Sequence, residues 1–379
     1  MDNGTTILID LWKDETGIKV TANIRFTSAM DNKYSFYLAD GFVIDELNDG
    51  ISPMEYKCCE EKLEFRAPTK RVDINTTGIN ELFLSYHGKV ESWHTLYEEE
   101  ILAINLYTAW YPTDLSNSTN YIVKVHMDHT YCLINGLYDE NEKVWYYYPL
   151  DYDVNIIALK NHKILQGDNI TLYYYGDKNK QAVMPYYENY NKIVRYYTEL
   201  YGNNKIKKSN IVILPKENLY GGYFRKELIV FGGIQEDYDG IVHLLAHEIA
   251  HSWCQGARTD SWEDWLNETF AEWSALLFEL EVNHNINKFN DIISDKEMRF
   301  PNIIPIKTKD LSRPEGVHDN GVLHLYRLYC SCGADAIKKI LRAFDSLKNK
   351  TTDALIQKLH EEKVTVVLAD FISDISRIY

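Results

Sequence analysis

The sequence predicts an α+β protein with two domains, a β-rich N-terminal domain over residues 1–180 and a mostly helical domain over residues 181–379. A chain of 379 residues is long enough for two domains that each bury a core. Apolar residues recur with a period of two through the first part, which is typical of strands with one buried face. The period then becomes helical, and helical patterns fill most of the second part.

The β-rich part contains several short alternating segments. Residues 18–26 alternate most regularly, and the turn signal at residues 14–17 predicts that residues 7–12 pair with them as a hairpin. Similar alternation occurs at Tyr34, Phe36 and Leu38, at Leu82, Leu84 and Tyr86, and at Tyr121, Val123 and Val125. Short strands separated by Gly, Asn and Asp favour a β-sandwich or a saddle-like sheet. A last strand is expected at residues 170–175.

A change of period marks the domain boundary near residues 177–183. An amphipathic helix follows and ends at Gly202; its apolar positions are Tyr186, Tyr190, Ile193, Val194, Tyr197 and Leu200. Two short apolar strands are expected at residues 211–214 and 228–231. From about Asp239 onward the chain is expected to be helical.

The composition excludes several classes of partner. The formal net charge of −16 disfavours nucleic acid and anionic membrane surfaces, both of which repel an acidic protein. No apolar run is long enough for a membrane-spanning helix, and the polar N-terminus has no secretory signal, so we expect a cytoplasmic protein. The six cysteines lack the spacing of a structural zinc site and are expected to be free thiols. No signal specifies an oligomeric state.

The chemistry is concentrated in one short segment, His247-Glu248-Ile249-Ala250-His251. Two histidines at positions i and i+4 lie one helical turn apart on the same face, so both imidazoles can reach a single ion. The flanking residues are apolar nearly all round, which predicts a buried helix. Polar groups in such a helix need a partner, because burying them uncompensated is costly.

A third ligand is expected on the next helix, which begins at Trp265 and carries Glu268, 17 positions after His251. Two histidines and one carboxylate form the ligand set of a catalytic zinc, with the fourth position left for water. We therefore predict one zinc ion per chain, held by His247, His251 and Glu268; the alternative is an accidental buried cluster. Glu272 is a candidate partner for a histidine ring N–H, and His243 is interpreted as a polar residue near the helix end.

The motif resembles the zinc signature of the aminopeptidase N family, gluzincins with a thermolysin-like catalytic domain. The resemblance is carried by His247-Glu248-Ile249-Ala250-His251-Ser252-Trp253, Gly256, Trp265-Leu266-Asn267-Glu268, and the preceding Leu214-Pro215 and Tyr220-Gly221-Gly222-Tyr223. The segment Ala109-Trp110-Tyr111-Pro112 is similar to part of the family's saddle-like N-terminal domain. The resemblance implies zinc-dependent hydrolysis of a peptide substrate, with Glu248 as the general base.

Two departures from the family pattern affect the expected function. Phe224 stands where the family's Gly-x-Met-Glu-Asn segment has a glutamate that binds the substrate's amino group. Glu227 is a possible replacement for that carboxylate. His318 stands where the family has a tyrosine that stabilises the oxyanion, and a histidine can donate the same hydrogen bond. The alternative is that His318 is a surface residue.

Three hypotheses for function follow. The first is an aminopeptidase, favoured by the resemblance. The second is an endopeptidase or an atypical peptidase without amino-terminal recognition, favoured by Phe224. The third is a zinc-retaining peptide-binding protein with little turnover, which the intact Glu248 disfavours. In the two enzymes, residues 228–231 are expected to form an edge strand that pairs with an extended substrate.

Overall fold

The computed structural model describes residues 4–30, 33–63, 66–115, 119–151, 153–176, 179–215, 221–233, 237–362, 371 and 375. The chain divides into two compact units, Met1–Lys163 and Ile164–Tyr379. Each unit has a hydrophobic core of its own. Among the described helices, none combines the length and the apolar character needed to cross a bilayer.

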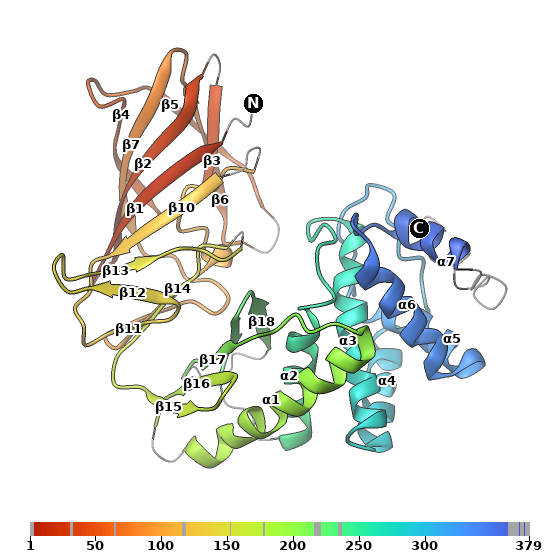
Figure 1. Ribbon diagram of the computed structural model, residues 1–379. Coiled ribbons are helices and arrows are strands. Elements are labelled where there is room, and N and C mark those ends of the chain that lie inside the picture. Colours follow the sequence, from red (N-terminus) through yellow and green to blue (C-terminus); the bar gives the residue numbers. More distant parts are fainter. Residues whose placement is uncertain are drawn as a thin grey trace. The chain divides into compact units, whose positions relative to one another are not determined.

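The first unit is built of strands (Figure 1). They are β1 (Thr5–Asp14), β2 (Gly17–Met30), β3 (Lys33–Ala39), β4 (Val43–Asn48), β5 (Tyr56–Glu60), β6 (Thr69–Asn75), β7 (Ile79–Gly88), β8 (Leu96–Glu98), β9 (Ile101–Ile104), β10 (Thr119–Val125), β11 (Cys132–Leu133), β12 (Gly136–Asp139), β13 (Val144–Tyr147) and β14 (Ile156–Leu159). Within the described ranges they form three sheets, ordered β12-β13-β10-β1-β2-β7-β4, β11-β14-β9-β8 and β3-β6-β5. The β-rich N-terminal part is therefore confirmed.

The predicted hairpin is the centre of the largest sheet. Strands β1 and β2 are antiparallel and Asp14 pairs with Gly17, so the turn lies where the sequence indicated it. Gly17 adopts a φ of +138°, and a Cβ there would lie 2.2 Å from the carbonyl oxygen of Gly88, so only glycine fits. The alternating apolar residues of β2 face the core, as a period of two requires.

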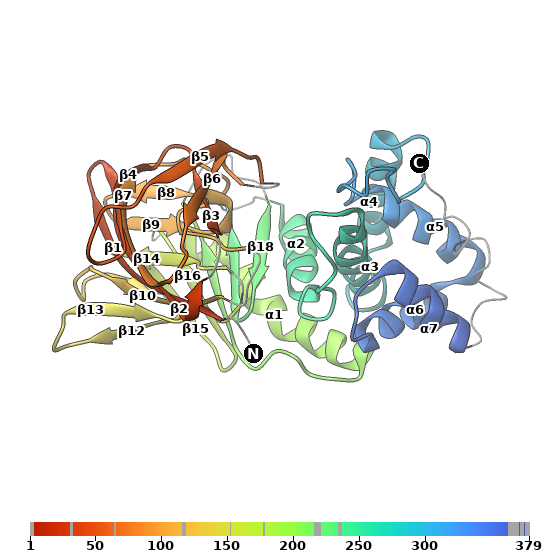
Figure 2. The same cartoon turned by 90° about the horizontal axis from the view of Figure 1, so that it is seen from above.

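The second unit combines one sheet with a group of helices. Its elements are β15 (Lys163–Gln166), β16 (Ile170–Tyr174), α1 (Lys180–Tyr201), β17 (Ser209–Ile213), β18 (Gly222–Arg225), β19 (Leu228–Phe231), α2 (Tyr238–Ala250), α3 (Trp265–Glu281), α4 (Ile286–Arg299), α5 (Asn320–Cys332), α6 (Ala334–Ser346) and α7 (Thr352–Glu361). The sheet has the order β15-β16-β17-β19-β18, in which β16, β17 and β19 are parallel. Helices α2 and α3 lie side by side, as Figure 2 shows.

Helix α1 matches its sequence pattern. The apolar face of the helix is buried, and Gly202 ends it in the left-handed conformation. The buried Tyr197 hydroxyl donates to the carbonyl oxygen of Ala246, which joins α1 to α2. The phenol thereby satisfies its own polar atom inside the core while positioning the helix that carries the two histidines.

The division between the units lies earlier in the chain than the predicted boundary at 180/181. From the sequence, residues 170–175 are assigned to the β-rich domain as its last strand, because the helical period begins only after them. In the structure this segment, β16, pairs with β17 in the sheet of the second unit. The compact units accordingly divide after Lys163.

The predicted edge strand is also corrected. Residues 228–231 form β19, which lies between β17 and β18. Strand β18 forms the edge of the sheet next to β19, because a two-residue turn at Lys226 and Glu227 folds it back onto β19; β15 forms the opposite edge. Phe224 lies on this edge strand, opposite Ile229.

Candidate metal centre

Helix α2 carries His247 and ends at Ala250, so the second histidine of the motif, His251, is the residue that caps it. The Asp237 side chain accepts hydrogen bonds from the backbone N–H groups of Asp239 and Gly240, which caps the helix at its start. Its apolar residues are buried, so the helix lies inside the second unit. His247 and His251 therefore project from a fixed, buried backbone, with Glu248 beside them.

The connection to the next helix is held by Asn267. Its side chain accepts from the backbone N–H of Ala257 at 3.1 Å and donates to the carbonyl oxygen of the same residue at 3.0 Å. The loop after α2 is thereby tied to the first turn of α3. Because Glu268 follows Asn267 directly, this contact also fixes the backbone that carries the predicted third ligand.

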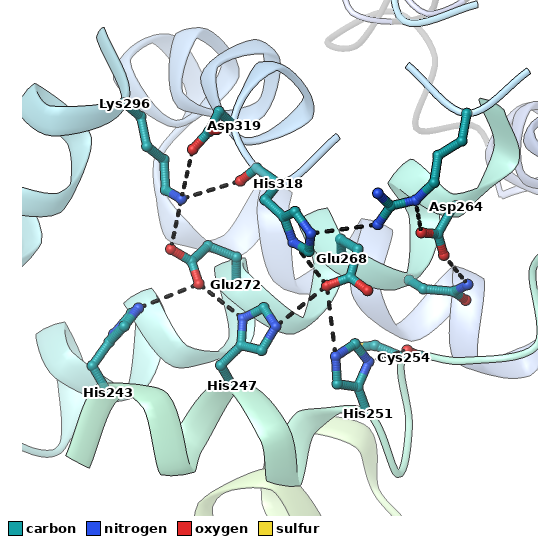
Figure 3. Close-up of polar contacts among 12 residues, drawn as sticks. His243, His247, His251, Cys254, Asp264, Glu268, Glu272, Lys296, His318 and Asp319 are labelled. Carbon is teal, nitrogen blue, oxygen red and sulfur yellow. Dashed lines mark hydrogen bonds and ion pairs between the residues drawn. The ribbon is translucent and has the colours of Figure 1, made fainter. Parts of the chain in front are cut away.

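The three predicted ligands converge. The Nε2 atoms of His247 and His251 lie 3.4 Å and 3.7 Å from the Oε2 atom of Glu268 (Figure 3). One ligand atom from each residue lies within 4.8 Å of the others, and no other group of three or more His, Cys, Asp or Glu among the described residues meets that criterion. The packing of α2 against α3 thus assembles a site from residues that are distant in the sequence.

The ring orientations of the histidines fit a zinc ion. The Nδ1 atom of His247 lies 2.9 Å from Glu272, and the Nδ1 atom of His251 lies 3.1 Å from the carbonyl oxygen of Cys254. Both partners accept a hydrogen bond from Nδ1–H, which leaves each Nε2 directed toward Glu268 and available to a metal ion. Zinc-binding histidines are held in this way, with the second nitrogen bonded to a carboxylate or a carbonyl. The donor set therefore fits zinc.

The electrostatics of the site also favour a cation. Burial alone would raise the pKa of Glu268, but the neighbouring His251, His247 and His318 hold it well below its usual range. Burial would lower the pKa of His247, whereas its bonds to Glu268 and Glu272 raise it to about 10. Positive charge is thus stabilised where the ligand atoms converge.

Glu248 lies in a different environment. Only 5% of the residue is exposed, and burial raises the pKa of its carboxyl to about 7, against the opposing effect of His247. A carboxyl that gains and loses a proton near neutrality is suited to general acid–base chemistry.

His318, which lies just before the start of α5, contacts the carboxylate of Glu268. Its Nδ1 atom is 3.1 Å from Oε2 of Glu268, although 54% of its side chain is exposed. Its Nε2 atom is 3.4 Å from Nη2 of Arg313, whose Nε donates to the buried Asp264 at 2.7 Å. The structure thus brings His318 to the candidate ligands from a half-exposed position.

Gly321 allows α5 to pack closely against α3. A Cβ at this position would lie 2.1 Å from Oγ1 of Thr269 and 3.2 Å from Trp265, both on α3. We therefore expect Gly321→Ala to destabilise the protein by about 1–3 kcal/mol, because α5 must move away from α3. Thermal unfolding tests this, with Ser331→Ala on the exposed side of α5 as the control. Equal melting temperatures for the two variants would contradict the expectation.

Several contacts around the candidate site had no signal in the sequence. Arg313 lies in a loop, and its importance depends on a pairing with Asp264 across 49 positions of sequence. Lys296 lies in an amphipathic helix and would ordinarily be interpreted as a surface residue. Glu272 was a candidate, and it bonds to both His243 and His247. His243 is therefore part of the hydrogen-bond network rather than an isolated residue near the helix end.

The structure describes part of the segment in which Phe224 stands at the position of the family's amine-binding glutamate. Phe224 packs against the core of the second unit, and Arg225 follows it, buried, with its guanidinium 5.0 Å from the centre of the Tyr223 ring. Glu227 lies in the exposed hairpin turn with a φ of +62°. Tyr220, part of the expected motif segment, lies outside the described residues.

The fold and the site can be compared with known proteins. No family model and no curated protein matches the sequence. The fold is that of the M1 zinc metallopeptidases, with a β-rich first part and a helical second part, as the resemblance predicted.

Two solved structures define this similarity. Native leukotriene A4 hydrolase from Saccharomyces cerevisiae superimposes with a TM-score of 0.67 at 16% identity, over 96% of this chain and 66% of the yeast chain. An M1 zinc metallopeptidase from Deinococcus radiodurans superimposes with a TM-score of 0.64 at 15% identity, over 98% of this chain and 94% of the bacterial chain. This chain thus spans slightly less than two thirds of the yeast enzyme.

Proposed function

We propose that the chain is a zinc-dependent peptidase in which His247, His251 and Glu268 hold one zinc ion. The observation that carries the proposal is the convergence of the two Nε2 atoms on one carboxylate oxygen, with both Nδ1 atoms bonded to acceptors. The M1 fold supports it, and a mutant of the Deinococcus protein has been solved with a Tyr-Ser-Ala substrate.

In the proposed reaction the protein supplies proton transfer and orientation. When bound, zinc supplies Lewis acidity for the scissile carbonyl and lowers the pKa of water. Glu248 takes the proton of the attacking water and delivers it to the nitrogen of the leaving amine. His318, whose Nδ1 atom lies 3.1 Å from Glu268 in the substrate-free structure, is proposed to turn its ring N–H toward the oxygen that becomes negative. The proton taken from water ends on the leaving amine, so the hydrolysis needs no further reactant.

The substrate is proposed to be a peptide rather than a nucleic acid or a membrane component. The net charge of −16 repels polyanions and does not hinder a neutral or cationic peptide. The direct test is cleavage of a mixture of short peptides. Loss of cleavage on chelation and its recovery with stoichiometric zinc would support the proposal, whereas cleavage that is insensitive to chelators would contradict it.

Among peptidases, we propose aminopeptidase activity with weakened recognition of the amino group. Phe224 cannot pair with an ammonium, and the neighbouring Arg225 adds positive charge. The second candidate is an endopeptidase, for which the same Phe224 is the favouring observation. In both cases we propose that β18 pairs with an extended peptide, because it is an edge strand of the sheet and carries Phe224.

Acetylation of the substrate distinguishes these candidates. A buried ion pair to the substrate ammonium would make acetylation cost several kcal/mol, because the carboxylate would be left unpaired. With Phe224 in that place, we expect a penalty of about 1–2 kcal/mol, or roughly tenfold in kcat/KM. The measurement compares free and acetylated forms of one peptide series.

The control for this comparison is Glu227→Gln. Glu227 is exposed in the hairpin turn, so we expect the variant to keep the small difference between the two peptide forms. A thousandfold penalty for acetylation that disappears in Glu227→Gln would show that this glutamate binds the amine. The protein would then be an ordinary aminopeptidase with a relocated anchor.

A further inference from the structure

Lys296 is a buried lysine that contacts two parts of the candidate site at once. Its Nζ atom lies 2.9 Å from Oε1 of Glu272, 3.3 Å from Oδ1 of Asp319, and 3.1 Å from the carbonyl oxygen of His318, to which it donates (Figure 3). Only 5% of the residue is exposed. It comes from α4, which contributes none of the predicted ligands.

The position of this lysine within its helix is unusual. The buried residues of α4 are Phe289, Ile293 and Lys296, so the lysine occupies a core position in an otherwise apolar stripe. Taking an ammonium out of water is costly unless it is paired and hydrogen-bonded. Here the pairing is provided by two carboxylates that are themselves almost fully buried, Glu272 and Asp319. The ammonium and these carboxylates therefore depend on one another.

Glu272 connects Lys296 to the predicted zinc ligand His247. One of its oxygens, Oε1, meets Lys296, while Oε2 lies 2.9 Å from Nδ1 of His247 and 3.3 Å from Nε2 of His243. With Oε1 held by the ammonium, the carboxylate plane is fixed and Oε2 faces the histidine. The imidazole of His247 is then oriented with its Nε2 toward Glu268.

We propose that Lys296 is a positioning residue of the metal centre, orienting His247 through Glu272 and the His318 segment through its backbone carbonyl. The inference rests on the proposed zinc site. A single side chain from α4 thus holds one ligand from α2 and the predicted oxyanion donor that precedes α5. Neither contact requires Lys296 to touch the metal or the substrate.

The first test measures zinc affinity in a double-mutant cycle on the full chain. Zinc dissociation constants are determined by competition with a chromophoric chelator for wild type, Lys296→Met, Glu272→Gln and the double variant. Loss of a contact behind a metal ligand weakens metal binding by roughly 10–100-fold. We expect about tenfold for Lys296→Met, and no additional weakening when the same change is made in Glu272→Gln, because the lysine acts through that carboxylate.

The matched control is Lys288→Met, the same substitution on the same helix. Lys288 pairs with Asp237 at 3.1 Å, away from the ligands, so the zinc dissociation constant should not change. A Lys296→Met protein that binds zinc as tightly as wild type overturns the proposal. So does a tenfold loss that persists undiminished in the Glu272→Gln background, or an equal loss in Lys288→Met.

Folding is monitored by the thermal unfolding of each zinc-free variant. Should Lys296→Met fail to fold, Lys296→Arg takes its place, since it keeps the positive charge. Binding of zinc within about threefold of wild type by this variant supports the proposal, because charge-based orientation is conserved. A loss as large as that of Glu272→Gln overturns it.

The second test uses peptide hydrolysis at saturating zinc. Because Lys296 also holds the His318 carbonyl, Lys296→Met should lower kcat about tenfold further than Glu272→Gln does, with a smaller change in KM. Equal kcat values for the two zinc-saturated variants overturn the link to His318. If wild type hydrolyses no peptide, the proposed function fails, whereas the zinc cycle still decides the role of Lys296.

Discussion

Replacing Glu248 with glutamine is expected to lower kcat/KM by about a hundredfold to ten-thousandfold while zinc remains bound. A positioned general acid–base group contributes a factor of this size. Glutamine has nearly the same shape as glutamate but cannot take a proton from water. Because burial raises the pKa of Glu248 to about 7, removing its charge also relieves a desolvation cost, and the variant should be at least as stable as wild type.

The measurement pairs kinetics with metal analysis of the purified protein. The matched control is Glu279→Gln, which changes another buried glutamate with a raised pKa, one whose side chain bonds to Asn283. It should retain activity within about twofold, as expected for a residue outside the reacting groups. Loss of zinc from Glu248→Gln would mean that this residue is a ligand rather than the base.

The central part of the site could be predicted because its chemistry is local. His247 and His251 are one helical turn apart, so their shared face follows from helix geometry alone. Glu268 required only that the following helix fold back on α2 after the connection over residues 251–264. The helix α1 and the β1–β2 hairpin were predictable for the same reason, since each depends on a pattern within about 25 residues.

Features that depend on distant pairing could not be read from the sequence. Residues 170–175 are predicted as a strand on either side of the domain boundary, and only their pairing with β17 assigns them to the second unit. Strand β18 contains Gly222 and Arg225 in four residues, too few for a periodic signal, so β19 was mistaken for the edge. The contacts of Lys296 link residues 22 or more positions apart. In these cases tertiary packing decides the role of the residue.

Among the substitutions considered, loss of the Glu268 carboxylate is expected to weaken zinc binding the most. We expect Glu268→Ala to weaken zinc binding by more than a hundredfold, beyond the 10–100-fold range for residues that only orient a ligand. Alanine leaves only the two histidines and removes the anion on which both Nε2 atoms converge. Competition with a chelator gives the dissociation constant, and peptide hydrolysis should be lost in parallel unless zinc is added in excess.

Two other glutamates test whether Glu268 is the true ligand. Glu263 accepts hydrogen bonds from the backbone N–H of Thr352 at 2.8 Å and from its hydroxyl at 2.6 Å, so Glu263→Gln should leave zinc binding unchanged. Glu272 lies on the Nδ1 side of His247, opposite the Nε2 atom that faces Glu268, so Glu272→Gln should weaken zinc binding by no more than expected for an orienting residue. If Glu268→Ala holds zinc as tightly as wild type while one of these variants loses it, that residue is the third ligand, and the orientation of both histidine rings must differ from the one described.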